Sequence, residues 1–322
     1  MPISEPLRQI IGRLLAKEPD ERYASALDCL EVIQACIGEA AITETSAIRE
    51  SHLQAATFVG REQEVAELLE ALEKAKQGHI GLCLVGGESG VGKSRLLQEV
   101  RARALVDDWK VIIGQGVAEG GKPYQLWVDI LPHLLLNVEL TDLEAGVLQP
   151  IVPDIDRILQ RPIPTPPDMR GDAGRDRLVM TIIAVLQRQP RPTLLLLEDL
   201  QWVEESLLPL KQLLRIREQF SALCIFGTYR DDERPSLLHE LPGGTHLSLE
   251  RLSETAVTRL SHAMLGEKAS PPELIALLTT ETEGNTFFIV EVMRTLAEEA
   301  GRLEHIGQMP LPTTIFTAGM GQ

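Results

Sequence analysis

The sequence predicts an α/β protein with a five-stranded parallel sheet, flanked by helices and preceded by a short helical segment. Helical and strand-like patterns alternate from Phe58 onward, as they do in a parallel sheet covered on both faces. A glycine-rich turn joins the first strand to a helix. Residues 194–197 form a continuous apolar run, which is typical of a strand buried on both faces.

The expected elements follow one another regularly along the chain. Residues 5–37 carry apolar side chains at helical spacing, with a break at Pro19, and the small, polar and acidic residues 38–56 indicate a linker. An amphipathic helix is expected over 62–77. Strands are expected at 79–85, 110–113, 194–197, 223–229 and 246–249, and helices between them at 93–104, 124–160, 175–189 and 204–219.

The composition narrows the classes of partner. The formal net charge is -16 over 322 residues, so the surface repels nucleic acids and anionic lipids. No apolar run is long enough to span a membrane, the first residues lack the pattern of a signal peptide, and the four cysteines lack metal-ligand spacing. We therefore expect a cytoplasmic protein that binds neither nucleic acid nor a membrane through this part.

A phosphate-binding loop is predicted at residues 87–94, which fit the pattern G-x-x-x-x-G-K-[ST]. Its glycines (Gly87, Gly90 and Gly92) permit positive φ angles and a close approach of backbone N–H groups to phosphate oxygens. The helix that begins near Lys93 directs its positive end at the same anion. Lys93 would contact the β- and γ-phosphates of ATP, and the Ser94 hydroxyl would bind Mg²⁺. The alternative is an ordinary glycine turn before a helix.

Two acids, Glu198 and Asp199, follow the apolar strand at 194–197. In a nucleotide site, one such carboxylate reaches Mg²⁺ and its neighbour polarises the attacking water. The residues leave open which acid meets the metal. The alternative is a solvated strand end.

Thr228 and Arg230 lie at the end of the fourth strand. Ligands of open parallel sheets bind at the carboxyl ends of the strands, so both residues are expected to face the γ-phosphate. The alternative is a surface arginine that the following acids, Asp231, Asp232 and Glu233, hold in an ion pair.

Together these motifs resemble the STAND class of P-loop ATPases, in particular the AAA-type module fused to bacterial serine/threonine kinases, adenylate cyclases and regulators. The resemblance covers about residues 57–300 and rests on FVGRE (58–62), GGESGVGKSR (86–95), LLLLEDLQWVEES (194–206), GTYRDDE (227–233), LSLERLSETAV (247–257) and EGNTFFIVEV (283–292). It implies the strand order 5-1-4-3-2 and a helical lid after the sheet. It also implies that Val59 and Gly60 lie by the adenine, that Arg95 belongs to the nucleotide site and that Arg230 senses the γ-phosphate.

The sequence departs from the family pattern at three points. Glu198 stands where the family usually has Asp. Glu204 replaces the Asp of the family's W-x-D motif, which is Trp202-Val203-Glu204 here. The family's G-N-P in the lid is Gly284-Asn285-Thr286 here, so a nucleotide contact by Asn285 is left open.

Residues 7–33 resemble the last two helices of a protein kinase domain, with Arg22 at the position of the arginine that pairs with the activation-segment glutamate. The alternative is an unrelated helical pair. No kinase active-site motif accompanies them, so protein kinase activity is not expected. The predicted divisions are a kinase remnant (1–37), a linker (38–56), an AAA-type core (57–252) and a helical lid with the C-terminus (253–322), within a fragment of a larger sensor kinase.

The leading functional hypothesis is a slowly hydrolysing, Mg²⁺-dependent ATPase switch that signals through protein partners or self-association. A small-molecule P-loop kinase would need an acceptor pocket and an arginine-rich lid. A non-catalytic docking module is the third alternative, and a nucleotide titration separates it from the first.

Overall fold

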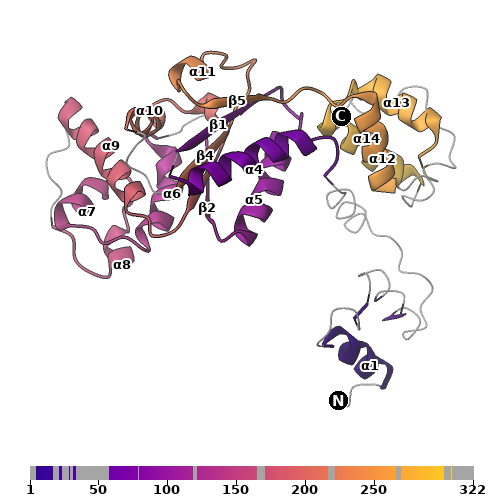
Figure 1. Cartoon of the computed structure of the whole chain (residues 1–322), viewed down its shortest axis with the longest axis horizontal. Helices are drawn as coiled ribbons and strands as arrows, with labels where there is room; N and C mark the ends of the chain where they lie inside the picture. The colour runs from indigo at the N-terminus through magenta and orange to yellow at the C-terminus, as the bar shows by residue number, and fades with distance from the viewer. Residues whose placement is uncertain are drawn as a thin grey trace.

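In this computed structural model, the chain forms a sheet-containing body, a helical subdomain and a separate N-terminal helix (Figure 1). The structure describes residues 5–16, 22–23, 29, 32–33, 58–78, 80–118, 122–164, 171–216, 222–265, 270–300 and 306. The expected second N-terminal helix and the linker at 38–56 lie largely or wholly outside them.

The body is built on a five-stranded sheet in which all pairs of neighbouring strands are parallel. The strand order is β2-β3-β4-β1-β5. Counted from the other edge this is 5-1-4-3-2, so the predicted fold class and strand order are confirmed. The strands are β1 (Gly81–Gly86), β2 (Lys110–Gln115), β3 (Thr193–Glu198), β4 (Leu223–Thr228) and β5 (Thr245–Ser248).

Side chains alternate between two hydrophobic cores, one on each face of the sheet. On β1, Cys83 and Val85 pack with α4 (Glu62–Lys76) and α5 (Lys93–Val106). Leu82 and Leu84 face the other core, as the two-residue period of a strand requires. That second core includes residues of α6 (Gln125–Leu135), α7 (Asp142–Leu148), α8 (Ile155–Leu159), α9 (Gly171–Gln187), α10 (Leu207–Arg215) and α11 (Leu237–Glu240).

The element boundaries differ from expectation mainly on the second face. The region expected to be helical at 124–160 is three short helices, because Thr141 caps α7 with a capping box and Pro153 follows it. Helix α9 begins at Gly171, four residues before the expected start. A 3₁₀ turn, η2 (Leu200–Trp202), precedes α10, which begins three residues later than expected.

The helical subdomain has its own core. It consists of α12 (Glu254–Leu265), α13 (Pro272–Thr282) and α14 (Thr286–Ala300). Buried side chains from all three helices meet there, among them Leu260, Leu278 and Met293. This subdomain, called the lid below, follows the sheet as the sequence implied.

The N-terminal helix α1 (Glu5–Leu14) lies apart from the body and the lid (Figure 1). Three of its large apolar side chains, Leu7, Ile11 and Leu14, are exposed. Arg22 donates a hydrogen bond to the carbonyl oxygen of Ala16.

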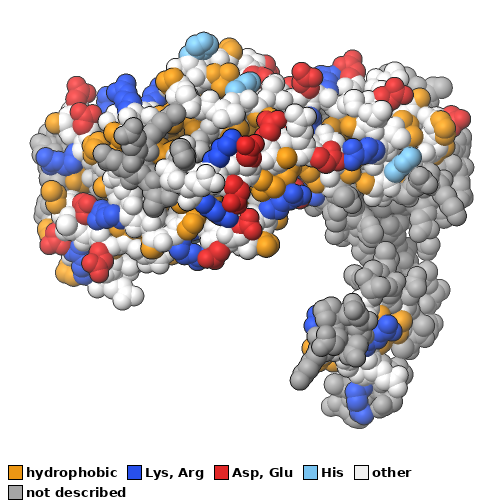
Figure 2. Space-filling model, viewed as in Figure 1, with side chains coloured by type: hydrophobic (Ala, Val, Ile, Leu, Met, Phe, Trp, Pro, Cys, Tyr) orange, Lys and Arg blue, Asp and Glu red, His pale blue; other side chains and the backbone are white. Residues whose placement is uncertain are grey.

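The visible surface carries acidic and basic side chains interspersed over the body and the lid (Figure 2). Within the described part of the chain, no helix combines the length and the apolar character that crossing a bilayer requires.

Candidate nucleotide-binding site

The loop between β1 and α5 has the backbone that its glycines predict. Gly87, Gly90 and Gly92 have φ angles of +148°, +79° and +104°. A Cβ at Gly87 would lie 2.6 Å from the carbonyl oxygen of Leu249. A residue with a Cβ atom would therefore be strained at Gly87, both by its backbone conformation and by this contact.

Lys93 begins α5 and is only 9% exposed. Its Nζ donates hydrogen bonds of 2.7 Å to the carbonyl oxygens of Gly87 and Glu88. Burial lowers the pKa of Lys93, and the positive charge of Arg230 lowers it further. The amino group is thus held inside the loop, at the place where an anion would relieve both effects.

The Ser94 hydroxyl donates a hydrogen bond of 2.6 Å to Oε2 of Glu198 at the end of β3. A hydroxyl and a carboxylate oxygen side by side suit Mg²⁺, which prefers oxygen ligands. Among the described residues, no group of three His, Cys, Asp or Glu side chains is placed to hold a metal ion. A Mg²⁺ ion here would therefore take its remaining ligands from phosphates and water, as it commonly does.

Asp199 follows Glu198 and has a left-handed backbone, with φ +58°. Its two carboxylate oxygens accept hydrogen bonds from Gln115 Nε2 at 3.3 Å and Gln201 Nε2 at 3.2 Å. Its N–H donates to the buried Thr228 hydroxyl at 3.3 Å. The two acids thus occupy different environments, and Thr228 supports the backbone of one of them.

Arg230 follows β4 and lies on the wall of the cleft described below. Its backbone N–H donates to Gln201 Oε1 at 3.1 Å. Its guanidinium forms a 2.6 Å ion pair with Glu233, which was one of the acids expected to compete for it.

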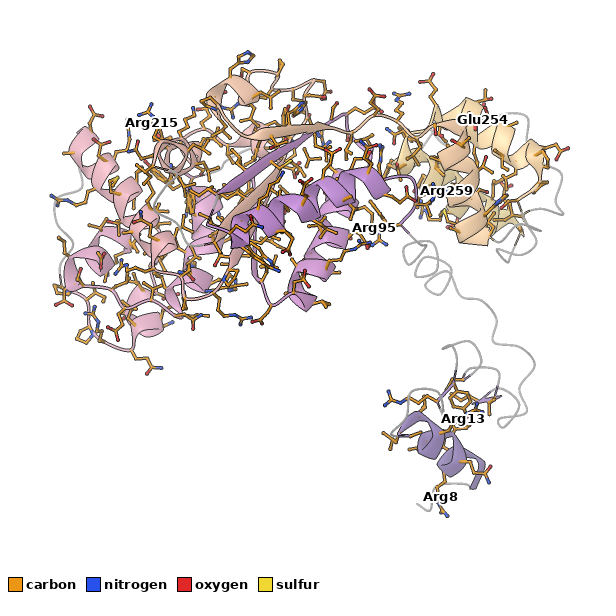
Figure 3. All side chains as sticks on the ribbon, viewed as in Figure 1. Arg8, Arg13, Arg95, Arg215, Glu254 and Arg259 are labelled. Atoms are coloured by element: carbon orange, nitrogen blue, oxygen red, sulfur yellow. The ribbon has the colours of Figure 1, made fainter. Side chains whose placement is uncertain are left out.

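A cleft of about 960 Å³ opens beside the loop. The polar part of its wall includes residues 89–95, with Arg95 among them, as well as Asp199 and Arg230. In Figure 3, Arg95 and Arg259 lie where the body meets the lid. The apolar part of the wall consists of Phe58, Val59, Leu252, Leu260, Met264, Phe287 and Val290.

The apolar part of the cleft combines the segment before α4 with the lid. Gly60 has a φ angle of +81°, and a Cβ there would lie 2.9 Å from Cβ of Ala256 on α12. The close approach of these two backbones places Val59 on the cleft wall. An apolar pocket next to a phosphate loop suits a flat aromatic base.

Asn285 connects the lid to the phosphate-binding loop. Its Nδ2 donates hydrogen bonds to the carbonyl oxygen of Ser89 at 2.9 Å and to Glu88 Oε1 at 3.2 Å. Its Oδ1 accepts from the N–H of Phe287 at 3.1 Å and so caps α14. Asn285 is 3% exposed and lies outside the cleft lining.

Two neighbours of Asn285 make the same connection. The Thr286 hydroxyl donates to the carbonyl oxygen of Val91 at 3.2 Å, and the N–H of Phe287 donates to that of Gly90 at 2.9 Å. A Cβ at Gly90 would lie 2.8 Å from Cβ of Phe287. The start of α14 therefore packs directly against the loop.

A further ion pair joins the loop to the segment that enters the lid. The Arg251 guanidinium donates to both carboxylate oxygens of Glu88, at 2.6 and 3.0 Å, and also contacts Glu283. The hydrogen bonds from Arg251 hold the pKa of Glu88 below its ordinary value.

Sequence reasoning missed the residues that support the predicted ones. Gln115 ends β2 beside β3, so its position at a carboxyl strand end was a usable signal. No such signal marked Gln201 or the ion pair of Glu88 and Arg251, because their roles depend on contacts between distant segments.

The sequence model of one protein family, the AAA ATPase domain, matches residues 57–226, which is more than half of the chain. The comparison with curated proteins found no match to the sequence of the chain.

The chain is similar to three solved structures. A STAND (signal transduction ATPase with numerous domains) protein with a tetratricopeptide repeat sensor, from Pyrococcus horikoshii, is 18% identical with a TM-score of 0.46; the match covers 81% of this chain and 31% of that one. Drosophila ORC bound to DNA is 12% identical with a TM-score of 0.54, and the match covers 88% of this chain and 73% of that one. The Aeropyrum pernix ORC1 protein in complex with DNA is 16% identical with a TM-score of 0.50, and the match covers 80% of this chain and 68% of that one. The chain thus spans about a third of the length of the STAND protein.

Proposed function

Because the chain belongs to the AAA ATPase domain family, we propose that it binds Mg·ATP, hydrolyses it slowly and acts as a nucleotide-dependent switch in a bacterial regulatory protein. The observation that carries this proposal is the contact between the lid and the phosphate-binding loop. Asn285, Thr286 and Phe287 donate to backbone carbonyls of that loop. A change in the loop on nucleotide binding is therefore transmitted to the lid without an intermediate.

The phosphate end of the site supports distinct roles for the two acids. We assign Glu198 to the metal side, since it is hydrogen-bonded to Ser94. Asp199 lies on the cleft wall and is oriented by Gln115 and Gln201, which suits a carboxylate that polarises the attacking water. When bound, Mg²⁺ would neutralise phosphate charge. Lys93 and the loop N–H groups hold the phosphates in place.

The other end of the cleft supports nucleoside binding. Val59 and the lid residues Leu260 and Met264 offer an apolar surface for the adenine. Arg230 is the candidate for distinguishing ATP from ADP, because it is the cation at the end of β4 on the cleft wall. In this structure its Nη1 is bonded to Glu233.

The test is hydrogen exchange with Mg·ATP, with Mg·ADP and without nucleotide. We expect protection at residues 87–94 with both nucleotides and a different protection at residues 285–290 with ATP alone, because a switch responds only through its differential affinity for the two states. Identical patterns with ATP and ADP would contradict the switch and leave only nucleotide binding. No change with either nucleotide would contradict both.

The arrangement of the whole chain is also a proposal. We propose that residues 1–37 are the end of a protein kinase domain, that 38–56 link it to the ATPase core at 57–252, and that the lid occupies 253–322. On this proposal the chain is part of a larger STAND-class signalling protein that acts through protein partners or self-association.

DNA binding is a second function to weigh, because two of the similar solved structures are bound to DNA. At 12% and 16% identity these structures share only the fold. The net charge of -16 and the mixed charges on the face shown in Figure 2 disfavour a phosphate-backbone interface there. We expect no binding to duplex DNA at low salt in a fluorescence anisotropy titration.

A further inference from the structure

Glu233 lies three residues after Arg230 and joins a closed cluster of three side chains. Its Oε1 accepts from Arg230 Nη1 at 2.6 Å, and its Oε2 accepts from Trp202 Nε1 at 3.0 Å. The Arg230 guanidinium lies over the Trp202 ring, 5.4 Å from its centroid. Each side chain thus contacts the other two, and Trp202 fixes the carboxylate that holds the arginine.

This cluster stands at the edge of the phosphate site. Arg230 and Lys93 both line the same cleft. Burial is the largest cause of the lowered pKa of Lys93, and the charge of Arg230 is the next. The positive charges of Lys93 and Arg230 therefore both face this cleft, so an anion bound beside Lys93 also attracts Arg230.

We propose that Glu233 is an internal competitor of the γ-phosphate, which holds Arg230 in the absence of ATP and limits how strongly the site prefers ATP over ADP. This inference rests on the proposed function, in which Arg230 senses the γ-phosphate. The planar guanidinium has five N–H donors, and an anion held by two oxygens takes two neighbouring donors. Glu233 accepts from one of these donors, Nη1. A γ-phosphate held through Nη1 displaces the carboxylate from that donor, whereas ADP makes no such demand. The broken ion pair therefore weakens the binding of ATP alone.

The strength of the pair sets the size of the effect. The side chains of Arg230 and Glu233 are 31% and 36% exposed. Pairs exposed to this extent are weak, so we expect Glu233 to reduce ATP affinity by up to about fivefold. A pair this weak biases the arginine without locking it, which suits a group that must be released in each cycle.

The test compares ATP and ADP affinities by calorimetry in the full chain. Glu233→Gln is nearly isosteric, keeps an oxygen for Trp202 and removes the charge. We expect it to bind ATP up to about fivefold more tightly, with ADP affinity unchanged. Glu233→Asp keeps the charge and should return the ratio toward that of the parent. Glu73→Gln is the matched control, because it breaks another i,i+3 pair, with Lys76, away from the cleft.

A second pair of variants separates this inference from the proposed function. If Arg230→Ala lowers the ATP/ADP affinity ratio and Glu233→Gln fails to raise it, the sensor stands and the competitor is wrong. If Arg230→Ala leaves the ratio unchanged, the sensor and the competitor both fail. If Glu233→Gln still strengthens ATP binding in the Arg230→Ala background, Glu233 acts as a general charge near the phosphates, which also overturns the proposal.

Tryptophan fluorescence gives a readout that a purely structural role would not change. Of the three tryptophans, Trp109 and Trp127 are 2% and 0% exposed, whereas Trp202 is partly exposed and lies under Arg230. Release of Arg230 should change the Trp202 emission with ATP and leave it unchanged with ADP. The change should disappear in Trp202→Phe and in Arg230→Ala. An identical response of the parent to ATP and ADP would overturn the proposal.

Discussion

At the scale of single residues, Lys93 has the clearest consequence for nucleotide affinity. Its buried amino group has two carbonyl partners and is placed to exchange them for phosphate oxygens. Removing one member of a buried charge pair costs about 2–5 kcal/mol, so Lys93→Ala should weaken Mg·ATP binding on the order of 100-fold. A fluorescent-ATP titration measures this change. The control, Lys76→Ala, removes an ammonium group at the end of α4, away from the cleft, and should have no effect.

The two acids at the end of β3 give opposite predictions. Asp199→Asn should keep ATP affinity and lose hydrolysis by about 100-fold or more, the usual contribution of a group that moves a proton. Glu198→Gln should instead raise the Mg²⁺ concentration needed to bind ATP, because the neutral amide is the poorer neighbour for the metal beside Ser94. Phosphate release and ATP titrations at several Mg²⁺ concentrations distinguish the variants. Exchanged phenotypes would reverse the assignment, and a large loss of melting temperature without nucleotide would indicate a structural role.

At the scale of elements, the contact between α14 and the phosphate-binding loop depends on one side chain with two functions. Asn285→Asp keeps the oxygen that caps α14 and replaces the donor that reaches Ser89. It also places a carboxylate near that of Glu88. An unsatisfied buried polar group costs about 1–3 kcal/mol, so the contact between α14 and the loop should weaken while α14 remains helical. Hydrogen exchange at residues 88–92 and 286–290 should then become faster.

Two variants control this prediction for the lid. Asn137→Asp adds the same charge at an exposed asparagine on the body and should leave the exchange unchanged. Glu88→Gln combined with Asn285→Asp removes the repulsion and should restore part of the protection. Unchanged exchange in Asn285→Asp would mean that the other contacts alone hold the lid.

At the scale of the whole molecule, sequence patterns predicted the features that depend on residues close together in the chain. The apolar run at 194–197, the glycines of the loop and the alternation of elements led to the sheet and to the position of Lys93 and Ser94. The contact between Asn285 and Glu88 joins residues 197 positions apart, and no periodicity encodes which side chains meet over that separation. Arg230 shows the same limit. Its place at a strand end was predictable, whereas its actual partner among three successive acids depended on the turn after β4.

The division of the chain near residue 57 can be tested by deletion. The three hydrophobic cores of the described residues draw on side chains from Val65 onward, with Phe58 packed at the edge of one core. Helix α1 contributes to none of them. A contribution of 1 kcal/mol would shift the melting temperature of a domain this large by about 2–4 °C, so deletion of residues 1–56 should change the temperature by less than this and leave ATP affinity intact. Extending the deletion to residue 65 removes Phe58, Val59 and the first turn of α4, and should weaken ATP binding because the apolar wall of the cleft is lost. Differential scanning fluorimetry with and without Mg·ATP measures both effects. A lower melting temperature after the shorter deletion would place the N-terminal segment within the folded unit and move the domain boundary toward residue 1.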